Sequence, residues 1–331
     1  MVGLGSLREL GELRVIQIVE RWLGNTSRAF IGFGDDVAAV RIRGKQVAVL
    51  KTDMLVGSTD IPPGMTWRQA ASKAIVANVS DLAAKGVEPI AGLVALGLPS
   101  VLTESDVVQI AKGLGEAART YGFPIVGGDT NASKDLVLSI ALFALADPKR
   151  IVLRNGARNG DIVAVTGKFG STAAGLKALL RYGMSAEELP RELYNSVYRP
   201  RARLDVGLKL AASKALTSSI DSSDGLAWSL HQLSESSRVG ILIEDIPVSK
   251  SATAFAKEHR IRDIDLALYG GEEYELVVTV PPKNFSRACR AARDHLMRIG
   301  VVTNRFRGVG MGSEGRIKQV EKKGWEHFKT Q

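Results

Sequence analysis

Acidic residues that follow a glycine or lie at the edge of an apolar segment recur along this chain. They are Asp35 and Asp36 in GFGDDVAAV, Asp53 in KTDMLV, Asp81 in NVSDLAAKG, Asp129 in VGGDTN, and Asp221 with Asp224 in SIDSSDG. An unpaired carboxylate facing a core would cost several kcal/mol. Mg²⁺ takes oxygen ligands, usually one or two carboxylates together with waters and substrate phosphates. The pattern therefore predicts a site for hard cations.

A purely structural role is the alternative for each acid taken alone, because Asp beside Gly or Ser often forms a turn or caps a helix. Asp81 fits that alternative poorly, since it lies within an alanine-rich helix with Asn78 on the same face. Asp35 and Asp36 are adjacent, and in an extended segment only one of them faces a shared site. The pattern does not decide which of the two faces the site, and the other is free to be merely exposed.

Other catalytic signatures are weak. No G-x-x-x-x-G-K-[ST] motif is present, and VTGKFGST (165–172) has Lys168 before its second glycine, so we interpret it as a structural strand-to-helix turn. GMGSEG (310–315) matches G-x-G-x-x-G, but a charged, strand-like segment follows it. The four histidines and Cys289 are distant in sequence from the acidic motifs, which favours metal-assisted chemistry over a covalent nucleophile.

The composition is that of a globular protein of two domains. The chain has 331 residues, 45% of them hydrophobic, and no apolar run reaches the roughly 18 residues of a membrane span. With one cysteine it has no internal disulfide and no four-cysteine metal site, so we expect a cytoplasmic protein. The net charge of +9 is scattered and not interleaved with aromatics, which argues against nucleic acid and fits small anionic ligands.

Capping signals and apolar periodicity place the elements of the first half. We expect a helix from Ser6 to Gly24, a β-hairpin over 37–50, and a helix from Thr66 to Lys85 capped by Gly86. A strand over 89–98 then precedes a helix starting in TESD (103–106), and strands over 124–127 and 136–146 complete this half.

The second half alternates strands and helices again. We expect strands over 161–167, 240–245, 274–280 and 298–304, and a further strand that ends at Asp221. We expect helices that begin at Ser171, Ser223, Ser249 and Asn284. The segment 147–161 is rich in Gly, Asn and charge, which indicates a boundary between residues 1–146 and 147–331. The pattern predicts two α/β domains.

Taken in order, the motifs resemble one family over nearly the whole chain. They are GDDVAAV, KTDMLV, NVSDLAAKGVEP, VGGDT, VTG, IDSSDGLA and GGEEYEL. This set closely resembles the thiamine-monophosphate kinase family, within the PurM-like superfamily of aminoimidazole ribonucleotide synthetase. The resemblance implies ATP-dependent phosphorylation of thiamine monophosphate to thiamine diphosphate with several Mg²⁺ ions. It also implies a two-domain PurM-like α/β fold, whose N-terminal domain (1–146) binds ATP and Mg²⁺ and pairs across a homodimer.

The resemblance also assigns residues. As Mg²⁺ ligands it implies Asp36, Thr52, Asp53, Asp81, Asp129, Asp221 and Asp224. As ATP contacts it implies Gly128, Asp129, Arg154 and Ser223, and as substrate contacts Asp60, Glu272 and the ring of Trp325. Three positions depart from the family pattern: Lys51 stands where a small hydroxyl residue is usual, Glu273 replaces Asp, and Ser222 takes an apolar position.

Two alternatives stay open from the sequence. One is another ATP-dependent enzyme of the same superfamily, similar to aminoimidazole ribonucleotide synthetase, although GGEEYEL and KKGWEHF (322–328) fit it less well. The other is a nucleotide-binding protein without catalytic activity, which would release no ADP.

Overall fold

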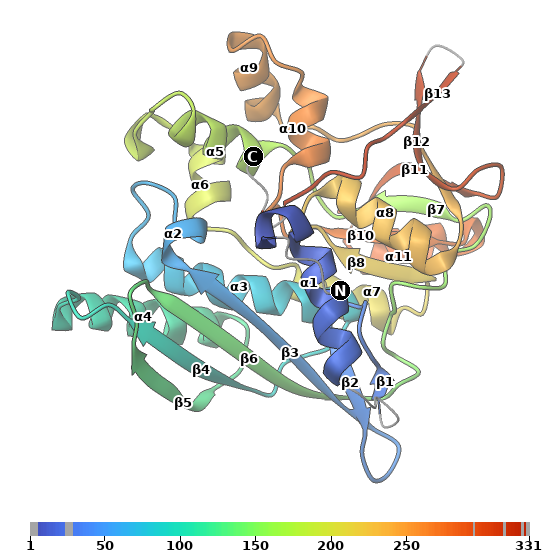
Figure 1. Ribbon diagram of the computed structural model, residues 1–331. Helices are drawn as coiled ribbons and strands as arrows, with labels where there is room; N and C mark the ends of the chain where they lie inside the picture. The colour runs from blue at the N-terminus through green and yellow to red at the C-terminus, as the bar shows by residue number, and fades with distance from the viewer. Residues whose placement is uncertain (1–5, 24–28, 294, 314–315, 326–327, 329–331) are drawn as a thin grey trace.

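Two β-sheets organise the chain in the computed structural model, which describes all residues except 1–5, 24–28, 294, 314–315, 326–327 and 329–331 (Figure 1). The first sheet contains β1 (Ala29–Ile31), β2 (Ala38–Arg41), β3 (Val47–Val56), β4 (Ala91–Leu98), β5 (Ile125–Ala132) and β6 (Val137–Ala146). Its strand order is β1-β2-β3-β6-β4-β5. All pairs are antiparallel except β4 with β5.

The second sheet uses the strands of the second half. They are β7 (Ile162–Val165), β8 (Ser218–Asp221), β9 (Gly240–Ile243), β10 (Leu276–Val280), β11 (Met297–Thr303), β12 (Gly308–Ser313) and β13 (Arg316–Gln319). Their order is β13-β12-β9-β11-β7-β10-β8. The mixed α/β class predicted from the sequence is therefore confirmed, whereas the roles assigned to domains 1–146 and 147–331 stay predictions.

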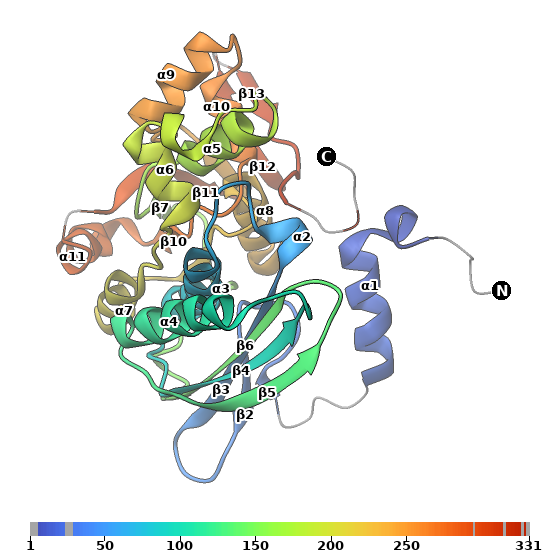
Figure 2. The same cartoon turned by 90° about the vertical axis from the view of Figure 1, so that its left-hand side faces the viewer.

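Helices cover the sheets. In chain order they are α1 (Leu7–Leu23), α2 (Gly57–Asp60), α3 (Trp67–Lys85), α4 (Glu104–Thr120), α5 (Ser171–Leu180), α6 (Arg191–Tyr198), α7 (Leu204–Ala212), α8 (Leu226–Ser237), α9 (Lys250–Glu258), α10 (Asp263–Tyr269) and α11 (Phe285–Ala291). Figure 2 shows α3 and α4 on one face of the first sheet and α1 on the opposite side. None of the described helices has both the length and the apolar content required to cross a bilayer.

Helix α3 lies between the two sheets and is nearly enclosed. Thr66 and Gln69 form a capping box at its start, and Gly86 ends it in the left-handed region at φ 66°. The helix contacts β3 and β6 of the first sheet and α7, β8 and β10 from the second half. A helix enclosed on several sides buries its polar residues too, and these include Lys73, Asp81 and Lys85.

Most predicted elements agree with the structure, but several bounds differ. The strand expected over 124–127 is β5, which runs from Ile125 to Ala132 and so includes Gly128 and Asp129. The helix expected from Ser223 begins at Leu226, because the preceding segment turns through Gly225 at φ 112°. Gly24, the predicted end of the first helix, lies outside the described residues. The described part of GMGSEG belongs to the β12–β13 hairpin, as its strand-like context predicted, while residues 314–315 lie outside the description.

Candidate active site

Three buried carboxylates meet where the two sheets approach α3. Asp36 lies in the turn between β1 and β2, Asp81 on α3, and Asp221 at the end of β8. One oxygen from each lies within 4.8 Å of the others. The Ser80 hydroxyl donates a 2.7 Å hydrogen bond to Asp221. Residues more than a hundred positions apart therefore form one acidic cluster.

The turn that carries Asp35 and Asp36 is held by two cations. Lys85 Nζ lies 2.6 Å from Asp35 and 2.7 Å from Asp36, and it donates a 2.8 Å hydrogen bond to the carbonyl of Ser219. Arg154 donates from Nε to Asp36 at 2.7 Å and from its backbone N–H to Asp35 at 3.1 Å. The expectation that one of these two acids is free to be merely exposed is wrong, because this segment is a turn and strand alternation does not apply to it.

Lys51 and Asp53 extend the cluster from β3. Lys51 Nζ lies 2.7 Å from Asp81 and 3.2 Å from Asp53. Asn78 does not share this role, because its side-chain oxygen accepts from the Asp53 backbone N–H at 2.9 Å and its nitrogen donates to the Ala74 carbonyl at 3.0 Å. Asn78 thus fixes β3 against α3.

The proton affinities of these carboxylates diverge. Burial disfavours the charged form of Asp36, yet Lys85 and Arg154 hold its pKa below the ordinary value. Burial, followed by the negative charge of Asp36, raises the pKa of Asp221 to about 6. Burial raises the pKa of Asp81 well above its ordinary value, and burial together with the charge of Asp221 raises that of Asp224 to about 7. Burial and neighbouring negative charges both disfavour an ionised carboxylate, so these acids are ionised together only when a cation is bound near them.

The donor set fits a hard divalent cation. Asp36, Asp81 and Asp221 offer carboxylate oxygens and no sulfur or imidazole, and their spacing allows them to share one ion or bridge neighbouring ions. Asp53 shares the Lys51 ammonium with Asp81, and Asp224 follows Asp221 in the same loop. The oxygen-only chemistry suits Mg²⁺ better than Zn²⁺ or copper.

Gly128 and Asp129 are separated from this cluster, and the Thr52 side chain is turned away from it although Thr52 lines one pocket with Asp36 and Lys51. On β3, Lys51 and Asp53 face α3, so Thr52 faces the opposite, open side, where its hydroxyl donates to the Ile140 carbonyl at 2.9 Å. Strand register places Asp129 in line with Met54, on the same open side. Strand β5, which carries both Gly128 and Asp129, is three strands from β3. A Cβ on Gly128 would lie 1.8 Å from the Val94 carbonyl oxygen, so the β4–β5 contact requires glycine there.

Two predicted substrate residues meet around a buried lysine. Lys73 on α3 forms an ion pair with Glu272 and donates a 2.8 Å hydrogen bond to the carbonyl of Asp60. The Asp60 carboxylate accepts from the Val56 backbone N–H at 2.7 Å. Glu272 has φ 62° and the nearby Tyr274 φ 52°, an unusual backbone for non-glycine residues that is common at functional sites.

Trp325 joins the C-terminal segment to the acidic loop. Its backbone N–H donates to the Asp224 carbonyl at 2.9 Å, and its side chain is 38% exposed. The ring lines a cavity of about 620 Å³ between α5 and α10, with Leu266 and Tyr269. Ser223 also lies in this loop and donates to Asp221 at 3.3 Å, while the neighbouring Ser222 hydroxyl is buried with no hydrogen-bond partner among the described residues.

The departure at Glu273 has a structural consequence. Its carboxylate accepts hydrogen bonds from the backbone N–H groups of Gly170 at 2.7 Å and Thr172 at 3.2 Å. These amides begin α5, where VTGKFGST places its turn. The protein's own carboxylate therefore occupies this anion position, which agrees with the structural interpretation of the motif.

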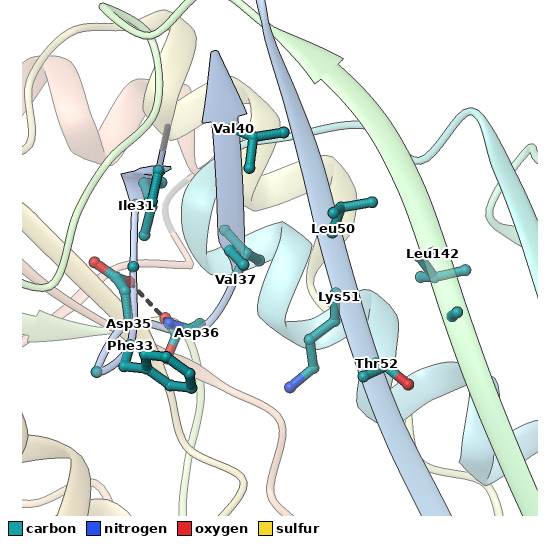
Figure 3. Close-up of a pocket in the computed structure, with 15 residues that line it drawn as sticks. Ile31, Phe33, Asp35, Asp36, Val37, Val40, Leu50, Lys51, Thr52 and Leu142 are labelled. Atoms are coloured by element: carbon teal, nitrogen blue, oxygen red, sulfur yellow. Dashed lines mark hydrogen bonds between the residues drawn. The ribbon is translucent and has the colours of Figure 1, made fainter. Parts of the chain in front are cut away.

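A pocket of about 660 Å³ opens beside the acidic cluster (Figure 3). Its lining combines polar residues of the cluster with apolar ones, among them Phe33, Asp36, Val37, Leu50 and Lys51. Lys51 leaves β3 toward the Asp35–Asp36 turn in this view, whereas Thr52 points toward β6. The pocket has the size and mixed lining of a small-molecule site.

The lysines of the site were not predicted from the sequence. Lys73 and Lys85 are buried on α3, and Lys51 was noted only as a departure from the family pattern. A signal was present, because Lys73, Ser80, Asp81 and Lys85 recur at helical spacing in a helix that is otherwise largely apolar. Lysines in an enclosed helix imply buried acidic partners.

Comparison with known proteins gives consistent results. Residues 34–146 match the family described as AIR synthase related protein, N-terminal domain. The chain is 37% identical to the thiamine-monophosphate kinase of Nitrosopumilus maritimus, over 98% of this chain and 100% of that protein. It is 33% identical to the one from Aquifex aeolicus, over 97% and 99%. The solved structure of AaThiL complexed with AMPPCP and TMP superposes with a TM-score of 0.85 at 32% identity, covering 98% and 99%.

Proposed function

Because the chain belongs to the thiamine-monophosphate kinase family and is therefore a kinase, we propose that it transfers the γ-phosphoryl group of ATP to thiamine monophosphate. The products are thiamine diphosphate and ADP. The observation that carries this proposal is the likeness, at 32% identity over nearly both chains, to a protein whose structure contains AMPPCP and TMP. A reaction that consumes ATP also fits the cytoplasmic location expected from the sequence.

The proposed reaction is a direct in-line transfer. A phosphate oxygen of thiamine monophosphate forms a bond to the γ-phosphorus of ATP, while the bond from that phosphorus to the bridging oxygen breaks and ADP leaves with the electron pair. Such a transfer needs alignment and neutralisation of charge and no covalent enzyme intermediate. The buried Lys85 and the half-buried Lys51 and Arg154 around the acidic cluster support this proposal, since they add positive charge where two anions must meet.

We assign the acids of the cluster to Mg²⁺. Asp36, Asp53, Asp81, Asp221 and Asp224 would hold it, and bound Mg²⁺ would supply charge neutralisation to the phosphate oxygens. Lys85 and Arg154 hold Asp36 ionised and fixed, and Ser80 orients Asp221. Thr52 and Asp129, also implied as ligands by the family resemblance, are assigned to the open side of the sheet.

The two cavities support separate positions for the two substrates. We place ATP in the 660 Å³ pocket beside Asp36, where apolar residues such as Val37 and Leu50 would contact the base, with Arg154, Ser223 and Gly128 as further contacts. We place the thiamine rings at the 620 Å³ cavity beside Trp325. Glu272 and Asp60, linked by Lys73, would contact thiamine monophosphate between them.

A homodimer completes the proposal. Gly128 and Asp129 lie three strands, roughly 14 Å, from β3, so one chain does not bring them to the acidic cluster. A second copy packed on the open side of the first sheet would place these residues at the shared interface, together with Thr52. The exposed apolar side chains of that side, among them Met54 and Leu93, support this arrangement.

Incubation of the purified protein with ATP, Mg²⁺ and thiamine monophosphate tests the activity. Chromatography of the thiamine species should show thiamine diphosphate, with one ADP released for each molecule formed. Formation of ADP with formylglycinamidine ribonucleotide, and no thiamine diphosphate, would assign the chain to the aminoimidazole ribonucleotide synthetase activity. Binding of ATP with no ADP release would indicate a nucleotide-binding protein.

A further inference from the structure

Lys51 places a positive charge between two of the predicted metal ligands. It lies on the side of β3 that faces α3, next to Asp53 on the same strand face. Asp81 approaches from α3, so that Lys51 Nζ lies 2.7 Å from Asp81 and 3.2 Å from Asp53. The Lys51 side chain is only 15% exposed. The ammonium group is therefore enclosed by the acidic cluster.

The hydrogen-bonding capacity of the ammonium is not exhausted by these partners. A lysine ammonium has three N–H donors and no acceptor. Among the described residues, Asp81 and Asp53 take two directions, which leaves one N–H available for a phosphate oxygen. The 660 Å³ pocket also has Lys51 in its lining, so an anionic ligand there could reach this donor.

Lys51 is the shared counter-ion of two carboxylates, since its ammonium forms ion pairs with both Asp81 and Asp53. One oxygen each of Asp36, Asp81 and Asp221 lies within 4.8 Å of the others, and among the described residues Lys51 forms the ion pair with Asp81. Without the Lys51 ammonium, the negative charges of Asp53 and Asp81 would lie close together with no positive charge from Lys51 between them.

We propose that the Lys51 ammonium stands in for one divalent cation of the acidic cluster. It neutralises Asp53 and Asp81 as a permanent monovalent ion carried by the chain, and its remaining N–H contacts a phosphate oxygen of the bound substrates. The inference rests on the proposed function, in which the same carboxylates bind Mg²⁺. It implies that Lys51 and a divalent ion compete for one position.

Counting bound metal tests this proposal without measuring activity. Mn²⁺, which can be quantified by electron paramagnetic resonance, replaces Mg²⁺ in equilibrium titrations of nucleotide-free protein. Lys51→Ala removes the ammonium and opens space, and it should bind one more Mn²⁺ per chain than the wild type. Lys51→Arg keeps a cation and should bind the wild-type number. Lys45→Ala, at the exposed β2–β3 turn, makes the same change in net charge and should also bind the wild-type number.

Folding of the variants is checked by circular dichroism. If Lys51→Ala does not fold, Lys51→Gln is counted instead, because its amide can still donate to Asp81 while carrying no charge. Equal Mn²⁺ numbers in the wild type and the neutral variants would overturn the inference, and the proposed function would still stand if the wild type forms thiamine diphosphate. An extra Mn²⁺ in Lys51→Ala, without any kinase activity of the wild type, would support the inference about Lys51 and contradict the proposed function.

Discussion

Single side chains in this protein act as counter-ions for one another, and Lys85 is the most enclosed of those described at the site. It is fully buried and contacts Asp35 at 2.6 Å, Asp36 at 2.7 Å and the Ser219 carbonyl at 2.8 Å. Removing one partner of a buried charge group leaves uncompensated charge and typically costs about 3–5 kcal/mol. We expect Lys85→Met to lower the free energy of unfolding by that amount, measured by urea denaturation.

An exposed lysine provides the matched control for Lys85. Lys209 pairs with Asp205 at 2.5 Å on the surface of α7. Exposed pairs contribute about 1 kcal/mol or less, so Lys209→Met should change the free energy of unfolding only within that range. A loss of similar, small size in both variants would contradict the role assigned to Lys85.

Asp81 tests the metal assignment at the same scale. Burial raises its pKa well above the ordinary value, although the Lys51 ammonium opposes this effect. Asp81→Asn keeps the size of the side chain and should keep the fold, because Lys51 still pairs with Asp53. Turnover should be almost entirely lost, because the amide oxygen is a neutral, weaker ligand for Mg²⁺. Near-normal turnover with an unchanged Mg²⁺ dependence would show that Asp81 is not a ligand.

At the scale of elements, capping residues and apolar periodicity in the sequence predicted helices and strands. Helix α3 was predicted from Thr66 to Lys85 with Gly86 as its cap, and the capping box and the left-handed glycine confirm this. The contacts of Lys51, Lys85 and Asp35 were not predictable in this way, because their partners are set by packing between distant segments. The separation of Thr52 and Asp129 from the acidic cluster likewise depends on strand order and register.

The contact between the Glu273 loop and the start of α5 predicts a pH effect. Burial raises the pKa of Glu273 to about 7 despite its hydrogen bonds from Gly170 and Thr172, whereas the unfolded value is 4.5. Between pH 4.5 and 7 the folded state retains a proton that the unfolded state has lost, so this group makes stability fall as pH rises through that window. Glu273→Gln keeps a hydrogen-bond acceptor and removes the titration.

Urea denaturation at pH 5 and pH 8 measures this effect. From pH 5 to pH 8 the wild type should lose about 1–3 kcal/mol more stability than Glu273→Gln. Other titrating groups, including Asp221 and Asp224, are common to both proteins and cancel in the comparison. Parallel pH profiles for the two proteins would mean that Glu273 is already ionised at low pH in the folded state.

The C-terminal segment predicts a substrate-specific effect. Trp325 lines the 620 Å³ cavity and is tied to Asp224 through its backbone, so its ring can change without loss of that hydrogen bond. An indole face attracts a cation such as thiazolium by about 0.5–2 kcal/mol. Trp325→Ala should raise the KM for thiamine monophosphate by roughly 5- to 50-fold, with little change in the KM for ATP. Equal weakening of both substrates with a lower melting temperature would indicate a structural anchor.

For the whole molecule, the site depends on how the two sheets enclose α3. One side of the first sheet is covered by α3 and α4 (Figure 2). The acidic cluster brings together Asp81 of α3 and Asp221 at the end of β8. The other side exposes apolar residues, with Met54 at 65% and Leu93 at 50%. A monomer with such a side exposed would carry a large apolar patch, which is typical of an interface.

This open side predicts the oligomeric state and its link to activity. Light scattering should give a mass about twice the 35.5 kDa of the chain. Leu93→Asp puts a charge at the centre of the open side and should yield a monomer with turnover reduced at least about 10-fold, because Gly128, Asp129 and Thr52 would lose their partner copy. Ile317→Asp is the matched control, since Ile317 is also apolar and 52% exposed but lies on β13 of the second sheet. A fully active Leu93→Asp monomer would show that one chain completes the site, and a dimer lost equally in Ile317→Asp would place the interface elsewhere.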